Sequence, residues 1–133
     1  MIKLKWSHLF LYIFLLGCSI KSGDEVDFLF QEIMDAHDEV MPKMGKIRSL
    51  EKQCRSTALT SPDSLELIRQ AEILSNANEA MMAWMRDFNS NFQGSNLEKR
   101  EYLLVQKMEL YQVKELMDTG ILQGEKLVRS AIN

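Results

Sequence analysis

The stretch that decides the fold class runs from residue 24 to residue 54 and reads DEVDFLFQEIMDAHDEVMPKMGKIRSLEKQC. Pro42 has no amide hydrogen to donate to the carbonyl of Asp38, so a kink is predicted at this point. On both sides of it, apolar side chains return every three or four residues, which predicts a helix with one buried face. The predicted buried face contains one histidine among its apolar residues: Val26, Phe30, Ile33, His37, Val40, Met44, Ile47, Leu50 and Cys54.

A second segment has the same spacing. Residues 55–61 are polar and predict the loop before it. Ser61 before Pro62 predicts an N-cap and a first helical residue, and we expect the helix to end near Gln93 and Gly94. Its predicted face contains Leu67, Ala71, Leu74, Asn78, Met81, Met85, Phe88 and Phe92.

A third helix is predicted to begin at Ser95 and Glu98. These residues match a capping box, in which each side chain bonds the backbone amide of the other residue. Gly120 and Gly124 leave two alternatives, a bend that divides the helix or a close approach by a neighbouring helix. Its predicted apolar face contains Leu97, Leu104, Met108, Tyr111, Met117, Ile121, Val128 and Ile132.

Three long amphipathic segments joined by short loops predict an all-α fold. Each segment has an apolar face that it cannot bury alone, so we expect an antiparallel three-helix bundle. A division near Gly120 would make it a four-helix bundle. The seven-residue spacing predicts coiled-coil-like seams, which a second copy of the chain could complete.

Composition fits one modest domain and excludes some partners. The chain has 133 residues, of which 46% are hydrophobic, and its 16 Lys and Arg against 19 Asp and Glu give a net charge of −3. Nucleic acid is excluded as a partner because no basic run exceeds two residues. With only two Cys there is no disulfide framework.

The first 18 residues have the features of an export signal. Lys3 and Lys5 precede eight apolar residues, 9–16. At about 1.5 Å per residue this run spans about 12 Å, too short for the roughly 30 Å core of a membrane. The sequence therefore predicts a signal peptide rather than a membrane span.

The residues Leu15-Leu16-Gly17-Cys18 resemble the lipobox of bacterial lipoproteins. The resemblance implies cleavage before Cys18 and attachment of acyl chains such as palmitate to it. Residues 1–17 would then be the signal peptide, 18–24 the lipidated cysteine and its tether, and 25–133 the helical bundle. Because Ser19 follows the cysteine, the resemblance implies an outer-membrane anchor facing the periplasm or the exterior.

Removal of the signal leaves one His, one Trp, eight Met and, besides Cys18, only Cys54. We expect Cys54 to be a buried small apolar residue, with intermolecular pairing as the alternative. If the first two helices pair antiparallel about the loop at 56–61, His37 lies level with about residue 80. His37 would then meet Met81.

The soft side chains at this level suit a soft metal. Thioether and imidazole groups bind Cu(I) or Ag(I) without losing a proton, and the ring of Trp84 could cap such a cation. The alternative is that these methionines only fill the core, and then the protein needs no cofactor. The candidate ligands are His37, Met41, Met44, Met81 and Met85.

The sequence lacks the residues that most other metal and haem sites require. A di-iron bundle needs Glu-x-x-His, but position 34 is Met; c-type haem needs Cys-x-x-Cys-His; zinc lacks a second His. A b-type haem with His and Met ligands stays open. With one His and no nucleophile elbow, the sequence does not predict an enzyme. Asp38 or Glu79 could orient the imidazole.

Two stretches, HDEVMPKM at 37–44 and MMAWM at 81–85, resemble a group of small helical bacterial lipoproteins labelled "viral A-type inclusion protein". The group has no established activity, so the resemblance implies no catalysis. We therefore expect a lipid-anchored, non-enzymatic helical bundle of the cell envelope that acts through contacts with a protein partner or with its own copies. The alternative is a periplasmic Cu(I) or Ag(I) binding protein.

Overall fold

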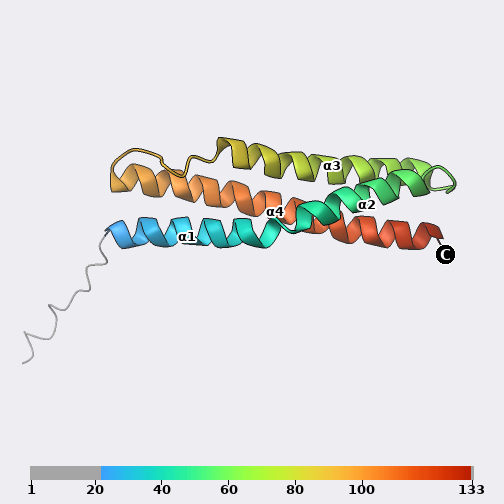
Figure 1. Ribbon diagram of the computed structural model, residues 1–133, viewed down its shortest axis with the longest axis horizontal. Coiled ribbons are helices and arrows are strands. Elements are labelled where there is room, and N and C mark those ends of the chain that lie inside the picture. The colour runs from blue at the N-terminus through green and yellow to red at the C-terminus, as the bar shows by residue number, and fades with distance from the viewer. Residues whose placement is uncertain (1–21, 133) are drawn as a thin grey trace, which may run out of the picture.

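The computed structural model describes residues 22–132 and contains four helices (Figure 1). They are α1 (Ser22–Val40), α2 (Lys43–Thr57), α3 (Ser64–Asp87) and α4 (Asn96–Ile132). The predicted signal peptide and the lipidation site Cys18 lie outside these residues. None of the described helices is long and apolar enough to cross a membrane.

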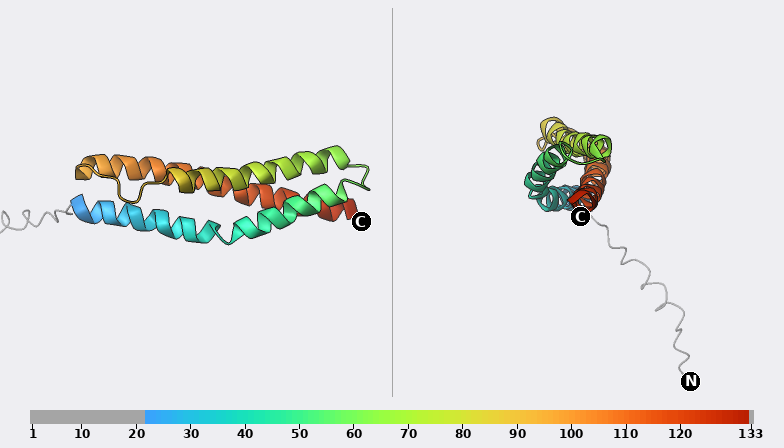
Figure 2. Two further views of the ribbon diagram at one scale, coloured as in Figure 1. Left: turned by 45° about the horizontal axis from the view of Figure 1, so that its top comes forward. Right: turned by 90° about the vertical axis from the view of Figure 1, so that its right-hand side faces the viewer.

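The four helices form a bundle of three rods, as Figures 1 and 2 show. Helices α1 and α2 follow one another along one side, α3 runs back, and α4 runs forward again over the full length. Helix α1 packs on the first half of α4, whereas α2 packs between α3 and the second half of α4. This arrangement confirms the predicted all-α three-helix bundle.

The first rod is broken where Pro42 predicts a kink. Helix α1 ends at Val40, and the amide of Met41 donates to the carbonyl of His37 at 3.0 Å. Pro42 itself keeps a helical backbone, with φ −61 and ψ −26, and stands as the residue before α2. The break lets α1 and α2 follow different paths around α4.

The third rod is continuous, so the predicted alternative of a division near Gly120 is wrong. Both glycines are buried within the 37 residues of α4. A Cβ atom at Gly124 would lie 2.7 Å from Cδ2 of Leu50 on α2, and the carbonyl of Gly120 accepts a hydrogen bond from Nε2 of Gln70 on α3 at 2.9 Å. The glycines therefore mark close approaches of neighbouring helices.

The core is one continuous cluster contributed by all three rods. Cys54 is fully buried with a free thiol, as predicted, and burial raises its pKa. Leu103, Leu110 and Met117 give α4 its buried face at seven-residue spacing. The largest fully buried side chains are Ile33, Val40, Ile47, Leu67, Leu74, Met81, Leu110 and Met117.

The predicted face for the first half of α4 is wrong. Leu97, Leu104, Met108 and Tyr111 are exposed, with 63%, 40%, 56% and 47% of their surface accessible. Helix α4 has two apolar stripes in this half, and the stripe through Leu103 and Leu110 is the one that packs inward. The periodicity of the outer residues is genuine, but no part of residues 22–132 covers them.

Both predicted ends of the second helix are also wrong. Helix α3 begins at Ser64, and Oγ of Ser61 accepts the amide of Asp63 at 3.1 Å instead of capping the helix. The helix ends at Asp87 rather than near residue 93, because the backbone of Phe88 is extended at ψ 116.

The start of α4 is predicted correctly. The amide of Ser95 donates to Oε2 of Glu98 at 2.7 Å, and the amide of Glu98 donates to Oγ of Ser95 at 3.4 Å. Hydrogen bonds from Ser95 lower the pKa of the Glu98 carboxyl. This reciprocal pair is the capping box that the spacing predicts.

Candidate functional site

His37, the histidine of the predicted metal site, contacts Trp84 across the bundle. The two ring centroids lie 6.1 Å apart with an interplanar angle of 35°, and Nδ1 of His37 lies 2.9 Å from Oδ1 of Asp38. The imidazole is one-quarter exposed. Pairing about the loop predicts contact with Met81, and the observed contact lies one turn further along α3.

The four methionines of the predicted site belong to the apolar core or pack against it. Met81 is fully buried and Met44 is 6% exposed, while Met41 and Met85 are partly buried against the core. Such positions suit methionine as a flexible filler. Within residues 22–132, no group of three His, Cys, Asp or Glu side chains is arranged to hold a metal.

A stack of aromatic rings, which we call the aromatic end, continues from Trp84 toward the start of α4. Trp84 stacks on Phe88 at 4.9 Å, Phe88 lies 6.3 Å from Tyr102, and Tyr102 stacks on Phe92 at 4.5 Å. Phe30 of α1 joins at 6.2 Å from Phe88. The stack ties α1 to the connector between α3 and α4.

Sequence reasoning missed the aromatic end because it placed Phe88 and Phe92 on a helical face. The amide of Asn89 donates to the hydroxyl of Tyr102 at 2.7 Å instead of continuing the helix. Nε1 of Trp84 donates to the carbonyl of Gln106 at 3.2 Å. The one available signal is the number of aromatic residues that flank the predicted turn.

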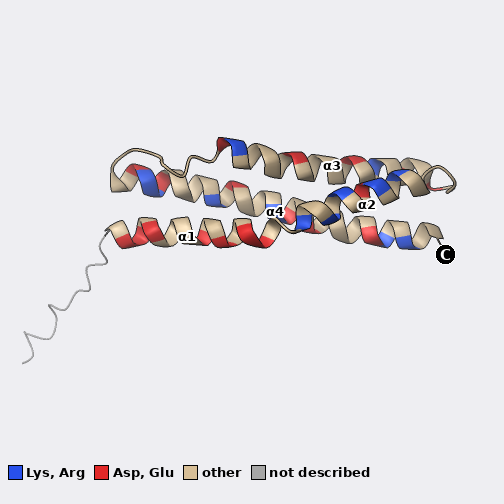
Figure 3. Cartoon of the chain, in the orientation of Figure 1, with Lys and Arg blue, Asp and Glu red and all other residues tan. Residues whose placement is uncertain are grey.

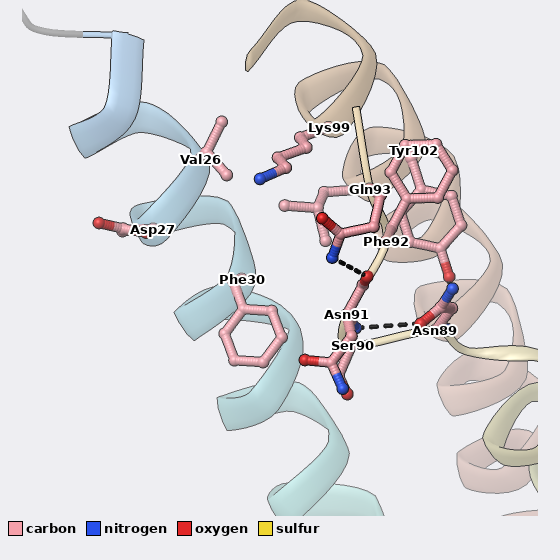
Figure 4. A pocket seen from close by; sticks show the side chains of 11 residues that line it. Val26, Asp27, Phe30, Asn89, Ser90, Asn91, Phe92, Gln93, Lys99 and Tyr102 are labelled. Carbon is pink, nitrogen blue, oxygen red and sulfur yellow. Dashed lines mark hydrogen bonds between the residues drawn. The ribbon is translucent and has the colours of Figure 1, made fainter. Parts of the chain in front are cut away.

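A cavity of about 330 Å³ opens beside the aromatic end (Figure 4). Val26 and Phe30 form one wall, and Phe92 and Tyr102 face them from the connector and α4. The amide groups at its floor bond the connector itself; Nε2 of Gln93, for example, donates to a backbone carbonyl at 2.7 Å. These groups supply packing and hydrogen bonds rather than an acid–base pair.

The second candidate is the outer stripe, by which we mean Leu97, Leu104, Met108 and Tyr111 of α4. Their spacing of seven, four and three residues puts them on one face of the helix. A shallow hollow of about 480 Å³ adjoins Met108 and Tyr111. Contiguous exposed apolar groups of this kind mark interaction surfaces more often than single exposed residues do.

A ladder of ion pairs lies between the outer stripe and the core. Each pair joins residues that are 75 positions apart: Glu25 with Arg100 at 2.6 Å, Glu32 with Lys107 at 2.9 Å, and Glu39 with Lys114. Lys43 and Asp118, at 2.6 Å, continue the same offset across the break. The constant offset shows that α1 and α4 run parallel in coiled-coil register.

The sign of the charges changes at Pro42. Helix α1 contains seven Asp and Glu and no Lys or Arg, whereas α2 contains five Lys and Arg and one Glu. Figure 3 shows the two halves of the first rod in opposite colours. Lys114 lowers the pKa of Glu39, and Asp118 raises the pKa of Lys43.

Comparisons of this chain with models of protein families, with curated proteins and with solved structures find no match. The aromatic end offers a packed cluster with a small cavity, and the outer stripe offers an uncovered apolar surface.

Proposed function

We propose that the protein is a non-enzymatic, lipid-anchored helical bundle of the cell envelope that acts through protein contacts made by the outer stripe. The observation that carries the proposal is the exposure of four large apolar side chains on one face of α4. Burial of this surface by a partner would contribute the hydrophobic stabilisation that the free bundle forgoes.

The outer stripe has the spacing with which a helix meets another helix. Apolar anchors separated by three, four and seven residues are the pattern of helix-in-groove and coiled-coil contacts. Arg100, Lys107 and Lys114 line one side of the stripe, and each is held by a glutamate of α1. The proposed contact therefore has an apolar centre and a fixed polar rim.

The anchor is proposed at Cys18, on the resemblance of Leu15-Leu16-Gly17-Cys18 to a lipobox. Acyl chains on this residue would hold the bundle at the outer membrane, because each buried CH₂ contributes about 0.8 kcal/mol. Replacement of Cys18 by Ser should move the protein from the membrane fraction to the soluble fraction. Loss of palmitate labelling in the same variant would identify the lipidated residue.

The contact surface can be tested in cells with the full chain. A photoreactive amino acid at Leu104 should give cross-linked protein adducts, whereas the same group at exposed Asn76 on α3 should not. Met108→Glu in the chain labelled at Leu104 should abolish the adducts. Equal labelling at the two positions, or none at Leu104, would overturn the proposed contact surface.

A second candidate function is the binding of Cu(I) or Ag(I), with His37, Met41, Met44, Met81 and Met85 as ligands and Trp84 as the cap. The contact between His37 and Trp84 favours it, since the indole proposed as the cap lies 6.1 Å from the imidazole, measured between ring centroids. Cu(I) titration against a chelator should give submicromolar binding that His37→Ala abolishes.

Met82→Leu is the matched control, because Met82 is partly exposed and is not among the proposed ligands. No binding in the unaltered protein would eliminate this function. If the residues only pack, His37→Leu should instead leave the bundle folded or stabilise it.

A further inference from the structure

The outer surface of the bundle is divided into an acidic half and a basic half. Beyond the ladder, Asp24 and Asp35 are exposed on α1 without a Lys or Arg partner among residues 22–132. In the other half, Arg48 and Lys52 are exposed on α2 without an Asp or Glu partner among the described residues, whereas Lys46 pairs with Glu125 of α4 at 2.7 Å. When two copies of the chain meet, the acidic half of one attracts the basic half of the other, whereas halves of the same sign repel each other.

We infer that the partner of the outer stripe is a second copy of this chain, bound antiparallel so that α1 of each copy faces α2 of the other. The inference rests on the proposed function, because it names the occupant of the same surface. A two-fold axis perpendicular to the rods near the break at Pro42 would pair α4 with α4 and each acidic half with a basic half. Such a two-fold contact is closed, so it gives a dimer and no filament.

The apolar residues on α4 also fit this arrangement. Leu122 is 69% exposed and lies on the same line of α4 as the outer stripe, past Glu115 and Asp118. Antiparallel pairing about this axis brings Tyr111, at the end of the outer stripe, toward Leu122 of the other copy. Parallel pairing would instead place the acidic α1 of one copy beside the acidic α1 of the other, where like charges repel each other.

The available surface is large enough for a stable dimer. The 37 residues of α4 span about 55 Å at about 1.5 Å per residue. A face two helices wide, about 20 Å across, offers on the order of 1,000 Å² per copy, which reaches the size of specific interfaces.

The test uses a chain that begins at Ser19, which retains every core residue because the core extends from Leu29 to Val128. Sedimentation equilibrium of the unaltered chain should give a dimer whose dissociation constant rises with salt. Met108→Glu should weaken it by about a hundredfold or more, whereas Asn76→Glu on α3 should leave it unchanged. A monomer at all concentrations would overturn the inference.

Two charge variants determine the orientation. One carries Asp24→Lys and Asp35→Lys on α1, and the other carries Ser49→Glu and Gln53→Glu on α2. In an antiparallel dimer each variant alone should dissociate, because both of its α1–α2 contacts become repulsive. An equimolar mixture should restore the dimer, because both contacts then join opposite charges.

Far-ultraviolet circular dichroism should show that each variant keeps the helical content of the unaltered chain. Dimerisation of the α1 variant by itself, without recovery in the mixture, would show a parallel dimer and overturn the inference. The inference and the proposed function can fail separately. Adducts at Leu104 with the mass of another protein, together with a monomer in sedimentation, would leave the contact surface standing and remove the second copy as its occupant.

Discussion

At the scale of single residues, Gly124 shows how closely the rods are packed. A Cβ at this position would lie 2.7 Å from Cδ2 of Leu50 and 3.3 Å from Cδ1 of Leu74. Gly124→Ala should therefore lower the free energy of unfolding by about 1–2 kcal/mol, since overpacking outweighs the gain in helix propensity. Urea unfolding followed by circular dichroism measures this change.

Gly45 is the matched control for Gly124, because it lies in α2 with open space around its Cα. Gly45→Ala should raise the free energy of unfolding by up to about 1 kcal/mol. The prediction for Gly124 fails if both alanines stabilise the protein equally. The sequence leaves open whether Gly124 bends the helix or admits a neighbour, because spacing alone does not locate Leu50.

Asn78 offers a second test at this scale. Its Oδ1 atom is buried in the bundle without a hydrogen-bond partner. An unsatisfied buried oxygen costs about 1–3 kcal/mol, so Asn78→Leu should raise the midpoint of urea unfolding. Asn76→Leu, at an exposed position two residues earlier, should leave the midpoint unchanged. A lower midpoint for Asn78→Leu would contradict the destabilising effect of this unpartnered oxygen.

At the scale of helices, the ladder fixes how α1 lies on α4. Glu32 and Lys107 form its central pair, and their side chains are 30% and 29% exposed. Glu32→Lys and Lys107→Glu should each destabilise the bundle, and the two together should restore most of the stability. A double-mutant cycle should give a coupling of about 0.2–1 kcal/mol that declines with salt. Additive effects in the cycle would contradict the pairing.

Helix α4 also shows where prediction from the sequence ends. Its first half carries two apolar stripes, one through Leu103 and Leu110 and one through Leu104 and Tyr111. Both have helical spacing, so periodicity alone cannot tell which stripe faces the core. The ladder decides, because Arg100 and Lys107 can meet α1 only when Leu103 and Leu110 point inward.

Features that depend on neighbouring residues of the chain can be predicted from this sequence, whereas contacts between helices cannot. Pro42, Ser95 and Glu98 act through their own backbone neighbourhood, and the break and the capping box follow from it. The end of α3 was predicted wrongly because Tyr102, a residue of another helix, accepts the amide of Asn89. For the candidate site, the approximate level of His37 could be predicted, but the aromatic end depends on contacts that no local rule contains.

At the scale of the whole molecule, the free energy of unfolding should decrease at acidic pH. Ion pairs with Lys114 and Lys46 hold the pKa values of Glu39 and Glu125 below their ordinary value of 4.5. A carboxyl whose pKa is lowered by folding stabilises the protein in full above 4.5 and loses that contribution as the pH falls through its folded value. The midpoint of urea unfolding should therefore fall as the pH decreases below 4.5.

Glu98→Gln is a useful variant for this experiment, because the pKa of Glu98 is lowered by hydrogen bonds from Ser95 rather than by a cation. It should remove part of the acid dependence at every salt concentration, whereas the part due to Glu39 and Glu125 should decline with salt. A midpoint that rises on acidification would contradict the assignment of these carboxylates.

The burial of Cys54 makes the rate of its alkylation a measure of how often the bundle opens locally. In a chain that begins at Ser19 it is the single thiol, and both its complete burial and its raised pKa suppress reaction with an alkylating reagent. Alkylation must then wait until α2 separates from α3, so its rate at excess reagent reports how often that end of the rod opens. If the dimer forms, raising the protein concentration should slow the reaction without any change in the reagent.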